Sequence, residues 1–88
     1  MKSTVTVINK LGLHARASAK LTKMAGSFPC QVWVRRGERK VNAKSIMGVM
    51  MLAAGIGTEL EIETEGEQEA QAMQALLALI NDKFGEGE

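Results

Sequence analysis

The alternation of polar and apolar residues along the chain predicts four β-strands. It is clearest over residues 59–65, where glutamates occupy every second position and Leu60 and Ile62 lie between them. Because successive side chains of a strand point to opposite faces, this pattern indicates one face in water and the other in a core. Shorter β-branched stretches bounded by turn residues predict the other strands at residues 4–8, 31–35 and 39–42.

Between the strands, apolar residues recur every three or four positions and predict three helices. The first begins at Ala15 and is closed by Gly26, with a proline beyond it, a usual combination at a helix C-terminus. The second is short, and the Ser45 hydroxyl can cap its first turn. The third is amphipathic, and residues 85–88 after it are expected to fray. Its apolar face comprises Ala70, Met73, Leu76, Leu77, Ile80 and Phe84.

The predicted element order is β-α-β-β-α-β-α. No repeat, linker or low-complexity segment interrupts it, so we expect residues 1–88 to form a single domain. The helices must cover the apolar face of the sheet while the other face stays wet. This arrangement is an α+β, two-layer, open-faced β-sandwich with three helices on one face.

Charge and composition exclude several classes of protein. A net charge of +1 gives no overall field that would attract nucleic acid or an anionic membrane. The longest apolar run, residues 46–54, is far shorter than the roughly 20 residues of a membrane helix, and no apolar leader precedes the first strand. Cys30 is the only cysteine, which excludes an internal disulfide and suits a reducing compartment. We therefore expect a cytoplasmic protein without membrane insertion.

The strongest candidate for chemistry is the only histidine, His14, which lies where the first helix begins. Phosphoryl transfer needs a nucleophile, which a neutral imidazole supplies, and positive charge around the migrating oxygens. Arg16 offers a cation, and the N–H groups of Ala15, Arg16 and Ala17 can cradle a phosphate at the helix N-terminus. Gly12 allows the turn that brings the ring to these groups. The pattern predicts a site that holds a phosphoryl group covalently, with a solvated loop histidine as the alternative.

Residues 1–34 contain no aspartate or glutamate. A hydrolase needs an acidic group near the histidine to activate water, whereas a phosphoryl carrier must avoid one. This composition favours storage of the phosphoryl group over its hydrolysis, unless folding brings a distant carboxylate to the ring. No metal site is expected, because the glutamates of residues 59–69 have no accompanying histidine or cysteine.

The short second helix has almost no polar side. Only one of its sides can face the sheet, so we expect Val49 and Leu52 to point inward. Met47, Met50 and Met51 should then be at least partly exposed, which would form an apolar docking surface. Methionine suits a surface that meets several partners because its side chain repacks easily. The alternative is that these methionines fill the core of a domain poor in aromatic residues.

Two segments of the chain, GLHARAS at residues 12–18 and NAKSIMG at residues 42–48, resemble motifs of a known family. The first is similar to the active-site signature, and the second to the regulatory serine region, of the HPr family, the histidine-containing phosphocarriers of the bacterial phosphoenolpyruvate-dependent phosphotransferase system. The resemblance extends over residues 4–84. It departs from the family pattern at Ala17, where many members have proline, so a slightly less rigid helix start is expected.

The resemblance implies an antiparallel sheet with strand order 1-4-2-3. It also implies that His14 accepts a phosphoryl group on Nδ1 from enzyme I and passes it to an A-type enzyme II component, without a cofactor. Such a protein is a covalent carrier and not an autonomous enzyme, and exposing one face to many partners favours a monomer. The implied docking face joins the start of the first helix to the second helix. It comprises Ala15, Ala19, Lys20, Lys23, Ile46, Met47, Gly48, Met50 and Met51.

Ser45 has two interpretations. On the sequence alone it is a helix N-cap. The resemblance implies that it is also a phosphorylation target of HPr kinase/phosphorylase. A phosphoserine at a helix N-terminus is tolerated by the fold, and its charge beside the docking helix would impede acidic partners.

Two other functional classes stay open. One is a regulatory interaction module, including the nitrogen-related phosphotransferase paralogue, in which Ser45 and the methionine-rich helix matter more than His14. The other is a small RNA-binding domain that uses the cations at residues 35–40. The second class is disfavoured because base stacking needs aromatic side chains and only Trp33 is near.

Overall fold

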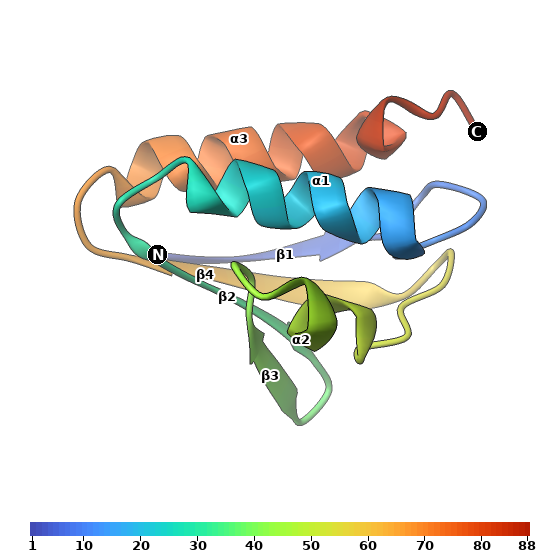
Figure 1. Cartoon of the computed structure of the whole chain (residues 1–88), viewed down its shortest axis with the longest axis horizontal. Helices are drawn as coiled ribbons and strands as arrows, with labels where there is room; N and C mark the ends of the chain where they lie inside the picture. Colours follow the sequence, from blue (N-terminus) through green and yellow to red (C-terminus); the bar gives the residue numbers. More distant parts are fainter.

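Four strands form one antiparallel sheet in the order β1-β4-β2-β3, which confirms the predicted fold class and strand order (Figure 1). The computed structural model describes all 88 residues. The register sets apolar residues opposite one another on the covered face, with Val5 opposite Leu60 and Val34 between Ile62 and Val41. The strands are β1 (Lys2–Thr6), β2 (Gln31–Arg36), β3 (Arg39–Asn42) and β4 (Glu59–Glu65).

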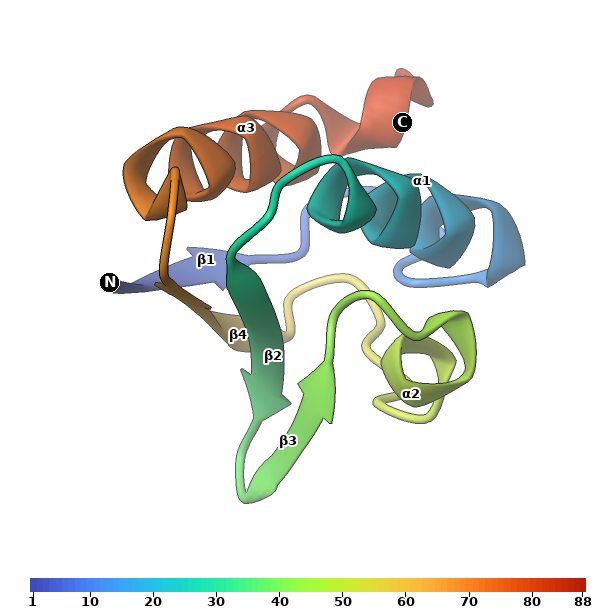
Figure 2. The ribbon, with the colours of Figure 1, turned by 60° about the vertical axis from the view of Figure 1, so that its left-hand side comes forward.

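Three helices cover one face of the sheet. They are α1 (Ala15–Gly26), α2 (Ile46–Met50) and α3 (Glu69–Asn81), and a short 3-10 turn, η1 (Lys83–Gly85), follows α3. Figure 2 shows α1 and α3 side by side, with α2 on the other side of α1 and close to β3. Figure 1 places the start of α1 and the C-terminus at the same end of the molecule. None of the helices has both the length and the apolar composition needed to cross a membrane.

The core consists of 20 buried apolar side chains between the helices and the sheet, and Phe84 is its only aromatic member. Leu21 of α1, Leu76 of α3 and Ile62 of β4 have no exposed surface. Burying a side chain of this size stabilises the fold by about 1.5–3 kcal/mol, so a few such residues account for much of the stability of a small domain. Cys30 is also buried, in agreement with a role as a small apolar residue.

The first and last predicted elements differ from the observed ones. Strand β1 ends at Thr6, which pairs with Glu59, the first residue of β4, so the predicted extension to residue 8 has no partner strand. In α3, Ala70 is exposed and Ala72 is buried. Ala70 lies six residues before Leu76, which places it about 120° away around the helix and off the buried face.

The predicted third helix also ends earlier than expected. Helix α3 stops at Asn81, and positive φ angles at Lys83 (54°) and Phe84 (55°) turn the Phe84 side chain into the core. That burial anchors the end of the chain. The following residues then fold back toward the start of α1, where the Lys10 amide donates to the Glu88 carbonyl at 3.0 Å.

Candidate functional site

His14 occupies the N-cap position of α1, and the loop before it is fixed by backbone contacts. The His14 carbonyl accepts a hydrogen bond from the Ser18 amide at 2.8 Å, the first bond of the helix. Gly12 has a φ of +64°, and a Cβ atom at that position would lie 2.4 Å from the Ala54 carbonyl oxygen. The Leu13 amide donates to the same oxygen at 2.8 Å. Glycine is therefore required here both for its backbone conformation and for its lack of a side chain.

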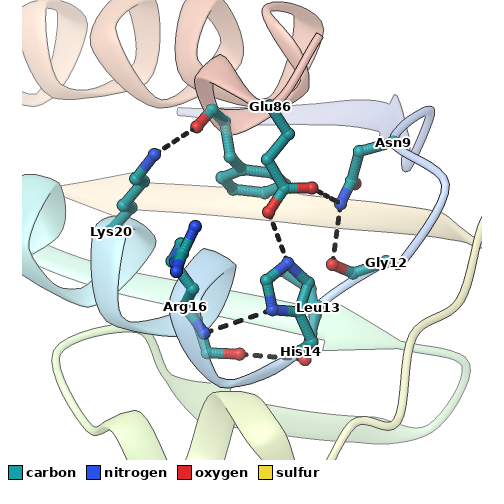
Figure 3. Close-up of polar contacts among 9 residues, drawn as sticks. Asn9, Gly12, Leu13, His14, Arg16, Lys20 and Glu86 are labelled. Atoms are coloured by element: carbon teal, nitrogen blue, oxygen red, sulfur yellow. Dashed lines mark hydrogen bonds and ion pairs between the residues drawn. The ribbon is translucent and has the colours of Figure 1, made fainter. Parts of the chain in front are cut away.

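The His14 ring has a defined contact at each nitrogen (Figure 3). Its Nδ1 accepts a hydrogen bond from the Arg16 amide at 3.3 Å, and its Nε2 contacts the Glu86 carboxylate. An acceptor nitrogen carries a lone pair, so these partners assign the proton of the neutral ring to Nε2. With 28% of its side chain exposed, the ring is held in place yet remains accessible to solvent.

Glu86 is the residue that the sequence analysis missed. Its Oε1 accepts from Asn9 Nδ2 at 2.9 Å while its Oε2 meets His14. The hydrogen bond from Asn9, followed by that from His14, holds the pKa of the Glu86 carboxyl below its usual range. Residues 1–34 contain no acidic residue, but folding brings a carboxylate to the ring from 72 residues away, which is the exception that the sequence left open. That carboxylate contacts Nε2 and not Nδ1.

The first turn of α1 offers free donors beside Nδ1. The amides of Ala15 and Ala17 have no acceptor within the chain, whereas the Arg16 amide meets the ring. The Arg16 side chain forms no ion pair, and it lines a polar pocket with Lys10, Lys20 and Glu86. Unpartnered amides, the positive end of the helix dipole and a free guanidinium together suit an anion.

Helix α2 and the two residues after it present the exposed methionines that the sequence predicts. Val49 is fully buried and Leu52 is 2% exposed, whereas Met47 is 68%, Met51 60% and Met50 40% exposed. The predicted inward and outward positions are therefore confirmed. Ile46 is also exposed, and Gly48 is half-buried. Ala15 and Ala19 are exposed on α1, the helix that packs beside α2 (Figure 2).

The two lysines of the predicted docking face, Lys20 and Lys23, lie near α3. Lys20 Nζ donates to the Phe84 carbonyl at 2.6 Å, on the side of α1 that faces the C-terminal segment (Figure 3). Lys20 and Lys23 line a shallow groove together with Leu79 of α3. Lys20 therefore does not border α2, because its position on the helix turns it toward α3 and the tail.

Ser45 caps α2 as predicted. Its Oγ accepts a hydrogen bond from the Gly48 amide at 3.2 Å, and its side chain is exposed. A Cβ atom at Gly48 would lie 3.3 Å from Cβ of Val41, so the glycine lets α2 approach β3 closely.

The cations of the β2–β3 hairpin are mostly engaged within the protein. Arg36 donates to the Leu52 and Ala53 carbonyls at 2.8 and 2.9 Å, and Arg39 donates to the Met51 carbonyl at 2.9 Å. Lys40 pairs with Glu63 at 3.1 Å and lies 5.1 Å from the centroid of the Trp33 ring. The arginine contacts hold the end of α2 against the sheet.

Comparison with known proteins agrees with the motifs. The family model described as the PTS HPr component phosphorylation site matches residues 1–82. The phosphocarrier protein HPr of Cupriavidus necator is 64% identical over 88 residues, which are 100% of this chain and 99% of that protein. Among solved structures, HPr-C-His from Thermoanaerobacter tengcongensis is 44% identical, covers 98% of this chain and 97% of its own, and superposes with a TM-score of 0.95.

An HPr dimer from Thermoanaerobacter tengcongensis also matches. It is 45% identical, with a TM-score of 0.80 over 96% of this chain and 97% of its own. Family match, sequence identity and fold agree over nearly the whole length, and both motifs fall in the matched region. The chain therefore belongs to the HPr family of the phosphotransferase system.

Proposed function

We propose that the protein is a phosphocarrier in which Nδ1 of His14 accepts a phosphoryl group from phosphorylated enzyme I and passes it to an A-type enzyme II component. The phosphoryl group originates from phosphoenolpyruvate, and the relay serves sugar uptake. The protein is then a covalent carrier in the cytoplasm, not an autonomous enzyme, and needs no cofactor. The observation that carries this proposal is the state of the ring, in which Nδ1 has a lone pair facing the start of α1.

The surroundings of Nδ1 suit a group that must be held and then released. An incoming phosphoryl group would replace the Arg16 amide at Nδ1, and that amide and those of Ala15 and Ala17 could then donate to its oxygens. The Arg16 guanidinium can reach the same oxygens with a fork of donors. No carboxylate contacts Nδ1, so none is placed to activate a water against the phosphorus.

The same partners would dock on the exposed surface formed by the start of α1 and by α2. The small side chains of Ala15 and Ala19 leave His14 accessible, and Met47 and Met51 provide apolar contact area. Lys23, on the exposed side of α1, would add positive charge at the border of this surface. Use of one face by several partners in turn favours a monomer.

Ser45 is proposed as the second control point, phosphorylated by HPr kinase/phosphorylase. Its hydroxyl is exposed and bonded only to the Gly48 amide, so a kinase could reach it without disturbing the core. A phosphate there would carry about −1.5 to −2 charges next to the exposed methionines. Binding of acidic partners would then weaken while the helix cap was preserved.

Incubation with phosphoenolpyruvate and enzyme I tests the carrier role. We expect a mass increase of one phosphoryl group that is lost in acid and kept in base, as for a phosphohistidine. His14→Ala should abolish it, and Ser45→Ala, a matched control on another helix cap, should retain it. Labelling of His14→Ala at the rate of the unmodified chain would contradict the proposal. Repeating the assay with the enzyme I of the nitrogen branch identifies which branch is served.

A further inference from the structure

We propose that Glu86 is a positioning residue for His14: its carboxylate holds the ring proton on Nε2 and thereby keeps Nδ1 free as the nucleophile. This inference rests on the proposed carrier function and adds a residue to it. The C-terminal segment is then part of the phosphoryl site, although it lies 72 residues from the histidine along the chain.

Both oxygens of the Glu86 carboxylate are engaged. Oε2 contacts His14 Nε2, and Oε1 accepts from Asn9 Nδ2, which is fully buried and also donates to the Gly12 carbonyl at 2.8 Å. Asn9 makes these two bonds while its own buried Oδ1 has no partner. The orientation of its amide therefore follows from the two acceptors it must serve, one of which is Glu86.

The segment that carries Glu86 is held on both sides. Before it, Phe84 is 1% exposed and its carbonyl accepts from Lys20 Nζ at 2.6 Å. After it, the Glu88 carbonyl accepts from the Lys10 amide at 3.0 Å. Only 15% of the Glu86 side chain is exposed. The contact with the ring therefore depends on the fold of this segment, and Figure 3 shows the Glu86 carboxylate facing the His14 ring.

The two contacts of the His14 ring favour the same tautomer, with the hydrogen on Nε2. The Arg16 amide requires a lone pair on Nδ1, and the Glu86 carboxylate requires a hydrogen on Nε2. A carboxylate that orients an imidazole through one nitrogen while the other reacts is the arrangement found in catalytic triads and around metal-bound histidines. Because the two nitrogens lie on different edges of the ring, the negative charge of Glu86 is kept away from the incoming phosphoryl group.

The transfer step balances without loss of a proton. The Nδ1 lone pair forms the new N–P bond, the N–P bond of phosphorylated enzyme I breaks, and its electron pair returns to the nitrogen of the donor. The His14 ring keeps its Nε2 hydrogen throughout and gains positive charge on phosphorylation. The Glu86 carboxylate offsets that charge, so it should favour both the attack and the phosphorylated product.

The test compares Glu86→Ala with Glu88→Ala, a control that removes the same charge two residues further along the same segment. Ring-¹⁵N-labelled chains are examined by NMR at a pH where His14 is neutral, and labelling by enzyme I is timed. For the unmodified chain and Glu88→Ala, we expect a ring protonated at Nε2 alone. For Glu86→Ala, we expect a mixture of the two tautomers and labelling slower by about threefold to tenfold, the effect of one partly exposed charge-assisted hydrogen bond.

The outcomes separate this inference from the carrier function. If the unmodified chain is not labelled at all, the proposed function fails. If it is labelled, but Glu86→Ala keeps either the ring spectrum or the labelling rate of the unmodified chain, the role assigned to Glu86 is wrong. An equal loss of rate in Glu88→Ala would also overturn it, because the effect would then belong to the charge of the segment and not to the contact with His14.

Discussion

Replacing Gly12 with alanine should damage both the stability of the fold and the phosphoryl site. The glycine has a φ of +64°, which alanine adopts only with strain. A Cβ atom there would also lie 2.4 Å from the Ala54 carbonyl oxygen and 2.7 Å from Cα of Gly55. Both are backbone atoms, so neither can rotate away. The Leu13 amide donates to that same oxygen, and separating the two loops would break this bond.

The size of the effect follows from three contributions. A left-handed backbone costs alanine about 1–2 kcal/mol, and overpacking against rigid atoms costs about 1–3 kcal/mol. Loss of the hydrogen bond from Leu13 adds about 1 kcal/mol. Alanine has fewer conformations than glycine in the unfolded chain, which offsets these losses by about 0.4–1 kcal/mol. We therefore expect Gly12→Ala to lower the free energy of unfolding by about 4 kcal/mol.

Gly37→Ala is the matched control. Gly37 has a φ of +59°, but nothing lies within 4 Å of the position its Cβ would take. This variant should lose only about 1 kcal/mol, from backbone strain alone. Urea unfolding followed by circular dichroism measures both losses. Equal losses in the two variants would refute the close approach of the loops as the reason for glycine at position 12. Gly12→Ala should also be labelled more slowly by enzyme I, because its loop carries His14, and Gly37→Ala should not.

Three further predictions concern other parts of the account. Phe84→Ala should lower the free energy of unfolding by about 3 kcal/mol and slow labelling, because the buried ring anchors the segment that carries Glu86; urea unfolding and timed labelling measure both. Ser45→Ala should lose about 1 kcal/mol through the missing cap on the Gly48 amide, and a thermal unfolding midpoint equal to that of the unmodified chain would contradict this. The pKa of Glu86 is lowered in the fold, so its contribution to stability is complete above the ordinary glutamate range and lost as the pH falls through the lower folded value. The difference in unfolding free energy between the unmodified chain and Glu86→Ala should therefore shrink on acidification, and a difference that grows would contradict it.

Elements with a strong local pattern could be predicted from the sequence. The alternation of residues 59–65 predicts the bounds of β4. The inward positions of Val49 and Leu52 follow because only one side of α2 and of the turn after it can face the sheet. The placement of His14 beside the first amides of α1 could also be predicted locally, because a histidine at a helix N-cap lies near the amides of the next residues.

Contacts between distant segments could not be predicted in this way. Glu86 reaches His14 because Phe84 turns into the core through two positive φ angles, and no periodicity signals such a turn. The family resemblance implies that Lys20 borders the docking face, yet its position on α1 directs it to the Phe84 carbonyl. Both differences arise in the C-terminal segment, where tertiary packing decides the path of the chain.

The identity of the nitrogen that carries the phosphoryl group is the most direct test of the account. The chain, labelled with ¹⁵N in its histidine ring, is phosphorylated with phosphoenolpyruvate and enzyme I, and its phosphorus–nitrogen coupling is measured by NMR. The account predicts coupling to Nδ1 of His14, with the hydrogen retained on Nε2. Coupling to Nε2, or a phosphorylated chain without coupling to either ring nitrogen, would contradict it.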